Sequence, residues 1–284
     1  MGVAVVFPGQ GSQSVGMADA WLTEPVAAAA IAEVGAAIGR DVVEGTRDEA
    51  MLATTAFAQP ALLACEVAAY RTLASAGLRP IAAAGHSLGE FSALVAAESL
   101  TLTDAARLVA VRGEAMQVAS DARPGGMTAL LGVGPLDAGE LCDVARGDDV
   151  LIVANENSPQ QVVASGSLDA LGRLEAICSE RRIRAVRLNV AGAFHSPLME
   201  PAIAALRAAI AGAEISAPTF PVASNVTGAL VRDPDPRGDA RPGRGAGLPA
   251  GTGHGETHPL RGRLLAFPAQ LLPAPLAEIG RAHV

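Results

Sequence analysis

The sequence contains no lysine: all 21 basic residues are arginine, against 29 acidic residues, in a chain of 284. The resulting net charge of −8 argues against a nucleic-acid binder, because such proteins carry a basic surface. The missing lysine also excludes a phosphate-binding loop of the P-loop type, which requires one. We therefore expect no nucleic-acid partner and no nucleotide site of that class.

Cysteines and long apolar runs are also scarce. The three cysteines, Cys65, Cys142 and Cys178, show neither metal-ligand spacing nor paired spacing, so we interpret them as reduced and partly buried. No apolar run is long enough to span a bilayer, and the N-terminus lacks the basic start of a signal peptide. These absences predict a cytoplasmic protein without a membrane partner, a metal site or a bound cofactor.

A Gly-x-Ser-x-Gly sequence, Gly-His-Ser-Leu-Gly, occupies residues 85–89. The apolar run 81–84 before it predicts a buried strand, and residues 90–97 after it are rich in good helix formers. Strand, sharp turn and helix form the context of a nucleophile elbow, in which the hydroxyl of Ser87 projects from the tip. The alternative is an ordinary strand-to-helix turn whose serine caps the helix.

Residues 3–7 are apolar and β-branched and predict the first strand, which continues into the glycine-rich loop 8–13. A dinucleotide-binding loop would need a third glycine at the position of Ser14, so we reject that interpretation. The loop is instead a tight strand end whose backbone N–H groups can face a ligand. Further on, we expect a helix that begins at Gln59-Pro60 and ends at Gly77.

The next helix is expected from about Asp104, after Thr103 as its cap, and it carries an arginine on its apolar side. Arg112 lies within that stripe, whereas Arg107 and Glu114 lie off it. The stripe follows a spacing of 3.6 residues and comprises Ala105, Leu108, Val109, Ala115 and Met116. An inward arginine is costly unless it meets an anion. It either forms a structural salt bridge with a buried Asp or Glu, or binds a substrate carboxylate through two parallel hydrogen bonds.

After residue 124 the pattern changes and predicts a subdomain of its own. The predicted order is strand 127–133, helix 136–145, strand 150–154, an Asn-rich turn at 155–159, strand 161–165, helix 168–180 and strand 185–190. The order β-α-β-β-α-β is that of the split βαβ ferredoxin-like unit. We therefore predict a ferredoxin-like small subdomain at 125–190, inserted into a discontinuous large catalytic subdomain formed by 1–124 and 191–231. A helix near 201–211 and a strand at 221–226 are expected to follow it.

A serine nucleophile needs a base within hydrogen-bond reach, and few histidines are available. Three of the five histidines lie after residue 232. His86 adjoins Ser87, but on a sharp elbow the neighbouring side chain generally points elsewhere. His195, in a loop before the helix expected near 201–211, is the better candidate for the base. The alternative for a lone loop histidine is a structural role.

Taken together and in this order, the motifs resemble the family of malonyl-CoA:acyl carrier protein transacylases, whose pattern polyketide synthase acyltransferase domains share. The resemblance runs from residue 3 to about 231. The residues that carry it are 7–13, 59–61, 85–90, Arg112, 157–159, 161–163, 193–196 and 224–228. It implies an α/β fold with an α/β-hydrolase-like large subdomain and the inserted ferredoxin-like one.

The resemblance also implies the reaction, that of an [acyl-carrier-protein] S-malonyltransferase. Malonyl-CoA would acylate Ser87 with His195 as base, and the phosphopantetheine thiol of an acyl carrier protein would then take the malonyl group in a ping-pong cycle. The backbone N–H groups of Gln10 and Leu88 would form the oxyanion hole, where one donor typically contributes roughly 3 kcal/mol. The phosphopantetheine belongs to the partner, so the enzyme itself needs no cofactor. We expect a monomer.

Three residues would bind the substrate's acyl part. Arg112 would bind the free malonyl carboxylate, and Gln59 belongs to the same implied pocket. Phe194, beside His195, would crowd an α-methyl branch and so favour malonyl groups. The alternative for Phe194 is ordinary core packing, and one pocket contact gives only modest discrimination.

Two other functions compete with this one. A serine hydrolase or thioesterase would share the elbow but has no need of Arg112. A non-catalytic carrier-protein-binding remnant is favoured if the atypical segment 232–284 is genuine. That segment holds 8 of the 19 prolines and 9 of the 31 glycines without periodicity, which predicts either a disordered tail or translation out of frame. Because Met1 lies just before the first strand, we expect a free-standing enzyme acting in trans, in fatty-acid or polyketide synthesis.

Overall fold

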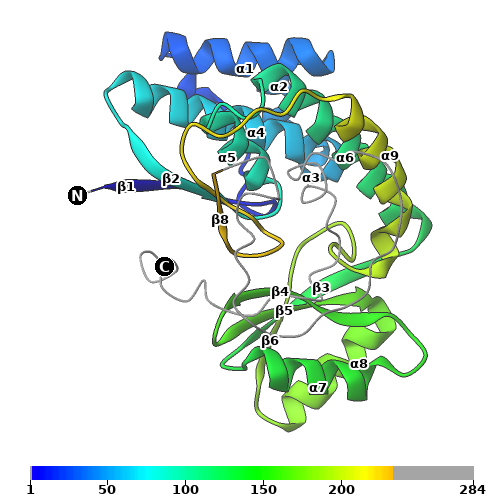
Figure 1. Cartoon of the computed structure of the whole chain (residues 1–284). Coiled ribbons are helices and arrows are strands. Elements are labelled where there is room, and N and C mark those ends of the chain that lie inside the picture. The colour runs from blue at the N-terminus through cyan, green and yellow to red at the C-terminus, as the bar shows by residue number, and fades with distance from the viewer. Residues whose placement is uncertain (1, 233–284) are drawn as a thin grey trace, which may run out of the picture.

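The computed structural model of the chain describes residues 2–232. The predicted atypical segment lies outside the described residues, except for Arg232. The described part forms two four-stranded sheets, each with its own helices (Figure 1).

The sheet of the large subdomain has the strand order β1-β2-β7-β8. Its strands are β1 (Val3–Phe7), β2 (Pro80–Gly85), β7 (Val222–Ala223) and β8 (Leu230–Val231). The first three are parallel, and β8 pairs antiparallel with β7. The helices of this subdomain are α1 (Pro25–Ile38), α2 (Val42–Arg47), α3 (Glu49–Ala53), α4 (Thr55–Ser75), α5 (Gly89–Ala96), α6 (Leu102–Ala122) and α9 (Glu200–Gly212), with 3-10 turns η1 (Asp19–Trp21) and η2 (Pro197–Met199).

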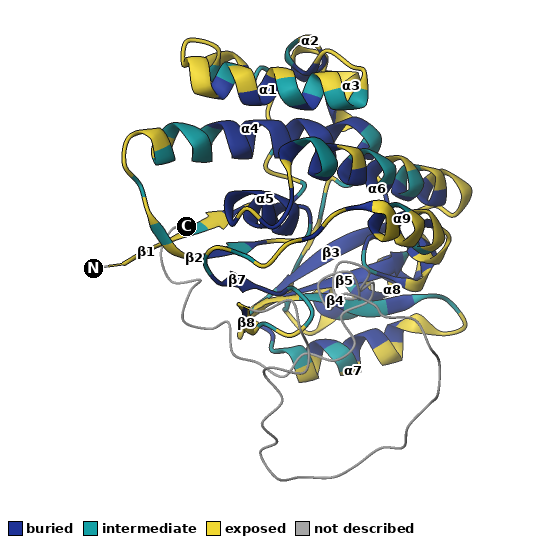
Figure 2. Cartoon of the chain, turned by 45° about the horizontal axis from the view of Figure 1, so that its top comes forward, coloured by how far each residue is buried: buried dark blue, intermediate teal, exposed yellow. Residues whose placement is uncertain are grey.

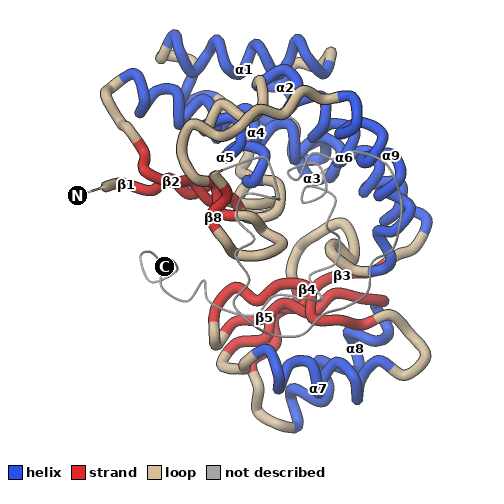
Figure 3. Tube along the Cα trace, viewed as in Figure 1, coloured by secondary structure: helices blue, strands red, loops and turns tan. Residues whose placement is uncertain are grey.

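The small subdomain is an antiparallel sheet covered on one face by two helices. Its strands are β3 (Gly125–Leu131), β4 (Leu151–Ser158), β5 (Gln161–Ser167) and β6 (Arg184–Arg187), and its helices are α7 (Pro135–Arg146) and α8 (Leu168–Glu180). The strand order is β4-β5-β3-β6, with every pair antiparallel. Helices α7 and α8 lie on the side away from the large subdomain (Figures 1 and 3). This arrangement confirms the predicted fold class; the limits at 124/125 and 190/191 stay a prediction.

The two faces of the small sheet belong to different cores. Leu130, Val162 and Ala164 form a separate apolar cluster with α7 and α8. Met127 and Val163 join the main cluster of the large subdomain instead. Because the alternating side chains of these strands pack on both sides, the small sheet is fixed against the large subdomain.

Helix α5 lies at the centre of the large subdomain, and all eight of its residues are buried (Figure 2). It begins directly after residue 88, so the elbow is attached to the most enclosed helix among the described elements. Displacing this helix would move Ser87.

Helix α4 begins earlier than the sequence predicts. It starts at Thr55, so Pro60 lies inside the helix rather than in its first turn. The missing N–H of Pro60 costs one helical hydrogen bond. The surrounding residues 57–68 are all buried, and this packing overrides the local preference. The predicted end is confirmed, since the helix stops at Ser75 and Gly77 has φ 99°.

Two other expectations are wrong in detail. The cap of α6 is Thr101, not Thr103, because its side chain accepts a hydrogen bond from the N–H of Asp104. The Asn-rich segment 155–158 is strand rather than turn. It continues β4 by pairing with β5, which leaves a two-residue hairpin turn at Pro159-Gln160.

Candidate active site

The elbow at Ser87 has the strained geometry expected of a nucleophile turn. Ser87 adopts φ 53°, in the left-handed region that non-glycine residues rarely occupy. A Cβ on Gly85 would lie 1.9 Å from the carbonyl carbon of Gly89, and one on Gly89 would lie 2.3 Å from the oxygen of Phe7. Both positions therefore require glycine. Ser87 itself stays partly exposed, so a substrate can reach it.

Asn225, which no sequence motif marked as a site residue, holds the elbow from the segment after the neighbouring strand β7. Its Oδ1 accepts a 2.7 Å hydrogen bond from the N–H of Ser87, and its Nδ2 donates to the carbonyl of Gly85 at 2.5 Å. The N–H of Asn225 in turn donates to Oε1 of the buried Glu90 at 3.1 Å. Asn225 comes shortly after β7, which the structure pairs parallel with β2, and the carboxyl ends of parallel strands meet at one edge of a sheet.

Arg112 reaches Ser87 from α6. Its guanidinium donates one hydrogen bond to Ser87 Oγ at 2.8 Å and another to Gln59 Oε1 at 2.7 Å. Gln59 continues the network by donating to Gln10 Oε1 at 3.4 Å. Residues predicted as the nucleophile, the carboxylate ligand and part of its pocket are thus brought together.

Arg112 is charged although it is buried, with 5% of its surface exposed. Burial lowers its pKa to about 10, and the negative charge of Glu90 acts in the opposite direction. The side chain therefore remains a cation at neutral pH. Its two hydrogen bonds named above go to neutral oxygens, and a carboxylate is a stronger partner for a guanidinium than either.

His195 lies in the loop before η2, with φ 58°. The loop is fixed by Ser196, whose Oγ donates to the carbonyl of Ala193 at 2.7 Å and accepts from the N–H of Leu198 at 3.2 Å. Burial, with smaller contributions from the charge of Arg112 and from His86, lowers the pKa of His195 to about 3. The imidazole is consequently neutral at neutral pH, the state in which it can accept a proton.

His86 is engaged with the small subdomain instead. Its side chain hydrogen-bonds with Asn157 of β4, which raises its pKa, while burial has the larger effect and the net pKa is lowered. A Cβ on Gly9 would lie 2.6 Å from His86 Nδ1, so the loop after β1 also packs on this ring. His86 thus links the elbow, strand β4 and the loop after β1.

The backbone N–H groups of Gln10 and Leu88 have no hydrogen-bond partner among the described residues. They belong to segments in direct contact, because a Cβ on Gly89 would also lie 2.5 Å from the oxygen of Pro8. Unpaired backbone donors are rare in folded chains, and two on adjoining loops can bind an anionic oxygen.

Phe194 is 5% exposed and packs in the main apolar cluster. This position fits both roles considered for the ring, core packing and a contact with the substrate's acyl group. A core residue beside His195 would also border the substrate on which the histidine acts. The three cysteines are free and buried, as expected.

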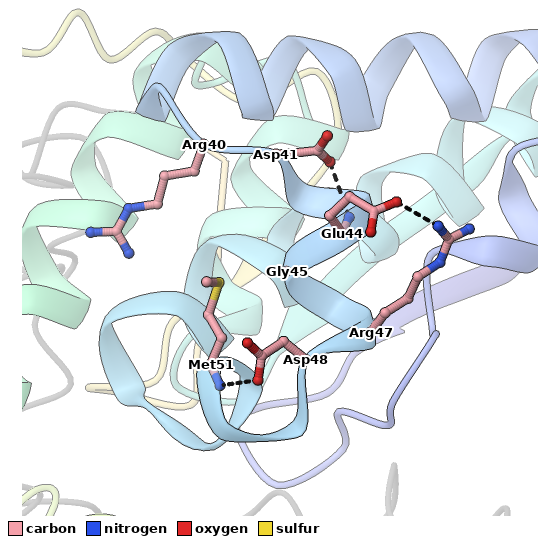
Figure 4. A pocket seen from close by; sticks show the side chains of 7 residues that line it. All are labelled: Arg40, Asp41, Glu44, Gly45, Arg47, Asp48 and Met51. Atoms are coloured by element: carbon pink, nitrogen blue, oxygen red, sulfur yellow. Dashed lines mark hydrogen bonds and ion pairs between the residues drawn. The ribbon is translucent and has the colours of Figure 1, made fainter.

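A surface cavity of about 590 Å³ lies elsewhere, around α2 and α3, and no predicted site residue lines it (Figure 4). Its lining residues are Arg40, Asp41, Glu44, Gly45, Arg47, Asp48 and Met51. Their charges serve local structure: Asp41 and Asp48 cap the two helices, and Arg47 pairs with Glu44 at 2.6 Å. We assign no chemistry to this cavity.

Other kinds of site are missing from the described part. Among residues 2–232, no group of three or more His, Cys, Asp or Glu side chains is placed to hold a metal ion. Within the same range, no helix has the length and apolar character needed to cross a bilayer.

The family model described as "Acyl transferase domain" matches residues 4–236. The chain belongs to this acyltransferase family. A relative, malonyl CoA-acyl carrier protein transacylase of Escherichia coli O157:H7, is 42% identical over 230 residues, covering 78% of this chain and 74% of the relative. The solved malonyl-CoA:acyl carrier protein transacylase of Xanthomonas oryzae pv. oryzae matches with a TM-score of 0.79 and 38% identity, over 93% of this chain and 80% of that one.

The family also extends to larger synthases. The acyltransferase domain from the second module of the salinomycin polyketide synthase matches with a TM-score of 0.72 and 39% identity, over 81% of this chain and 55% of that one. The resemblance stated from the motifs is therefore confirmed at the level of the family.

Proposed function

We propose that the chain transfers a malonyl group from malonyl-CoA to the phosphopantetheine thiol of an acyl carrier protein, as an [acyl-carrier-protein] S-malonyltransferase. The names of the relatives support this reaction. The observation that carries it in this chain is the buried cation of Arg112, whose guanidinium lies 2.8 Å from Ser87 Oγ. A malonyl group has the free carboxylate that such a cation binds, and an acetyl group does not.

In the first half-reaction, Ser87 Oγ attacks the thioester carbonyl while His195 takes the hydroxyl proton. The N–H groups of Gln10 and Leu88 bind the developing oxyanion. The C–S bond then breaks, His195 returns the proton to the CoA sulfur, and the malonyl group remains on Ser87 as an ester.

In the second half-reaction, the carrier's thiol gives its proton to His195 and its sulfur attacks the ester carbonyl. The C–O bond to Ser87 breaks, and the serine oxygen regains a proton from His195. The malonyl group leaves on the carrier as a thioester, and the enzyme returns to its starting state.

Substrate binding should also activate the base. The charge of Arg112 contributes to the low pKa of His195. A malonyl carboxylate paired with Arg112 would offset that charge and raise the pKa of His195 toward the range of an effective general base. An acetyl group has no carboxylate and would leave the effect of Arg112 on the pKa of His195 unchanged.

The pocket around the carboxylate includes two further residues. Gln59 orients Arg112 through its 2.7 Å hydrogen bond, and Phe194 limits the room for an α-methyl branch. A simple esterase or thioesterase gains nothing from a buried cation beside its serine, so this arrangement disfavours that alternative. We propose further that the enzyme is a cytoplasmic monomer.

The test compares donors. In Arg112→Ala, transfer from malonyl-CoA should fall by several kcal/mol in activation free energy, on the scale of a buried charged contact, while Ser87 stays reactive toward acetyl-CoA. The measurement is the ratio of malonyl to acetyl transfer rates. Arg107→Ala, an exposed arginine on the same helix, is the matched control and should leave the ratio unchanged.

Radioactive malonyl-CoA provides the second measurement, because label should bind wild type and not Ser87→Ala. Label on another residue, or an unchanged donor ratio in Arg112→Ala, would contradict the proposal. Arg112→Lys should recover only part of the malonyl activity, since an ammonium cannot reproduce the planar fork.

A further inference from the structure

The hydrogen bond between Arg112 and Ser87 has only one possible direction. A guanidinium carries five N–H donors and no acceptor, so Ser87 Oγ must accept from Arg112 at the observed 2.8 Å. The bond is charge-assisted, and such bonds are stronger than those between neutral groups. Arg112 thus engages a lone pair of the oxygen that has to attack the substrate.

The guanidinium is oriented toward Ser87 by a buried amide. Gln59 Oε1 accepts from Arg112 at 2.7 Å. The orientation of this amide is fixed, because its Nε2 donates to Gln10 Oε1 at 3.4 Å and to Sδ of Met116 at 3.4 Å. Both Gln59 and Arg112 are buried. The position of the cation therefore depends on a network in which the nucleophile is not needed.

The two contacts of the guanidinium differ in their access to a substrate. The bond to Gln59 is buried, whereas Ser87 is partly exposed. An entering carboxylate therefore meets Arg112 on the side of Ser87. Because a carboxylate is a stronger acceptor for a guanidinium than a hydroxyl is, it would replace Ser87 Oγ there and leave the bond to Gln59 in place.

The Arg112–Ser87 bond opposes attack by the serine. As Oγ forms its bond to the acyl carbon, its electrons are drawn toward the carbonyl and the oxygen becomes a weaker acceptor. A contact that is stronger in the ground state than in the transition state slows the reaction. This cost falls on every donor that offers Arg112 no other partner.

We propose that in the free enzyme the bond from Arg112 lowers the reactivity of Ser87, and that a carboxylate of the donor removes this restraint by withdrawing the guanidinium. The inference rests on the proposed function and goes beyond carboxylate binding, since it assigns the arginine a second role on the nucleophile. Selectivity for a carboxylated acyl group then arises in the rate of attack as well as in binding. A donor without a carboxylate, such as acetyl-CoA, meets a serine that is still bonded to a cation.

The same bond could instead activate Ser87, because a cation beside the oxygen also stabilises an alkoxide. The two roles predict opposite results. If Arg112 restrains Ser87, loss of the bond speeds the reaction of the serine with a neutral electrophile. If Arg112 activates Ser87, loss of the bond slows that reaction.

Methanesulfonyl fluoride is a small neutral probe of the serine. Ser87 Oγ attacks the sulfur, the S–F bond breaks, fluoride leaves and the hydroxyl proton passes to His195. The probe has neither a CoA group nor a carboxylate, so it makes no use of the substrate contacts. Mass spectrometry of the peptide that contains Ser87 measures the labelling rate, and Ser87→Ala should take no label there.

Formate supplies the carboxylate without an acyl group. In wild type, labelling should become faster as formate replaces chloride at constant ionic strength. The gain should level off at roughly 10-fold or more, the scale of one hydrogen bond to a charged group. Arg112→Met should show no such response. A wild-type rate that formate leaves unchanged or lowers would overturn the proposal.

Variants of the arginine provide a second measurement. Arg112→Met fills a similar space without an N–H donor, so it should be labelled faster than wild type in chloride. Arg112→Lys keeps the charge and should be labelled at an intermediate rate. Arg107→Met, an exposed arginine on the same helix, is the matched control and should keep the wild-type rate. Equal or slower labelling of Arg112→Met, in protein that circular dichroism shows to be folded, contradicts the restraint.

Binding of free malonate separates the restraint from a change in the base, because malonate does not react and no proton transfer to His195 is involved. In wild type, malonate has to displace Ser87 Oγ from Arg112, whereas in Ser87→Ala it has no such competitor. Calorimetry should therefore give binding that is roughly 5-fold or more tighter in Ser87→Ala than in wild type. Equal or weaker binding in Ser87→Ala would show that malonate does not compete with the serine for the guanidinium.

These measurements use neither malonyl-CoA nor a carrier protein, so they are independent of the proposed transfer. If the predicted changes are missing in a chain that transfers malonyl groups, the restraint is wrong and the proposed function stands. If they appear in a chain that transfers none, the restraint stands and the proposed function is wrong.

Discussion

Two regions of the large subdomain hold the candidate site by different means. At residues 85–89 the elbow is shaped by backbone atoms that leave no space for a Cβ at Gly85 or Gly89. On α4 the site is held by buried polar side chains instead. Gln59 lies in the hydrogen-bond network of Arg112, and Glu66, two turns later, bonds to Ser92 of α5 at 2.5 Å.

The difference separates two kinds of sensitivity. A close-packed backbone turn responds to added volume and is indifferent to pH. A buried polar contact tolerates changes of shape better but depends on protonation and on having every polar atom paired. Steric substitutions should therefore dominate at the elbow, and electrostatic ones on α4.

Gly85→Ala should have the largest effect. The new methyl would lie 1.9 Å from the carbonyl carbon of Gly89 and 2.0 Å from its oxygen, so the elbow must open. Displacement of a nucleophile by about 1 Å can cost about 10²-fold in rate, and we expect at least that loss in acylation by malonyl-CoA. The measurement is the rate of label incorporation at Ser87.

Gly172→Ala, on α8, is the control, because a Cβ there meets nothing within 4 Å. It should leave acylation unchanged and, as a helical glycine replaced by alanine, raise stability slightly. A Gly85→Ala protein that folds and acylates at the wild-type rate would show that the elbow is not sterically determined.

Asn225→Ala should have an intermediate effect, since the Asn225 side chain bonds to the backbone of the elbow on both sides of the turn. The substitution leaves the N–H of Ser87 and the carbonyl of Gly85 without the partners they have now. Leaving a buried polar group unpaired costs about 1–3 kcal/mol, which corresponds to roughly 10- to 100-fold in acylation if the elbow alone bears it. Asn189→Ala, an exposed asparagine, is the control. Wild-type acylation in Asn225→Ala would show that glycine packing alone fixes Ser87.

The sequence predicted what depends on local pattern. The strand, turn and helix around Ser87 follow from composition and two glycines, and Arg112 was found because a charge interrupted a stripe of 3.6-residue period. Both appear at the expected places, with Arg112 buried and bonded to Ser87. The β-α-β-β-α-β order likewise predicted the fold of the small subdomain, since each of its elements shows its own periodicity in the sequence.

What the sequence could not predict depends on contacts between distant segments. Asn225 meets Ser87 only because β7 lies beside β2, which no local pattern encodes. The predicted start of α4 was wrong because tertiary burial outweighs the preference of Pro60 for the first turn of a helix. Glu66 gave no signal, because a lone glutamate in a helix usually faces solvent.

Glu66 is the least satisfied group of the α4 region. It is 8% exposed, and its Oε1 has no hydrogen-bond partner among the described residues. Burial raises the pKa of this carboxyl to about 8, although the hydrogen bond from Ser92 acts in the opposite direction. Glu66 therefore carries a proton at neutral pH, and the α4–α5 contact joins two neutral groups.

Glu66→Gln should have the smallest effect on activity and a pH-dependent effect on stability. The folded state holds the Glu66 proton more tightly than the unfolded chain does, in which the pKa of this carboxyl is near its ordinary value of 4.5. As pH rises from about 4.5 to about 8, the unfolded chain ionises first, and wild type loses at most about 1.4 kcal/mol of stability per pH unit. Glutamine resembles the neutral acid in shape and polarity but cannot ionise, so this loss of stability should disappear in Glu66→Gln.

Denaturant unfolding of wild type, Glu66→Gln and the exposed control Glu49→Gln at pH 5, 6.5 and 8 measures the loss of stability. The first variant should match wild type at pH 5 and exceed it by the widest margin at pH 8. A constant difference at all three pH values would mean that Glu66 is ionised in the folded protein, and α4 would then hold the elbow through a charge.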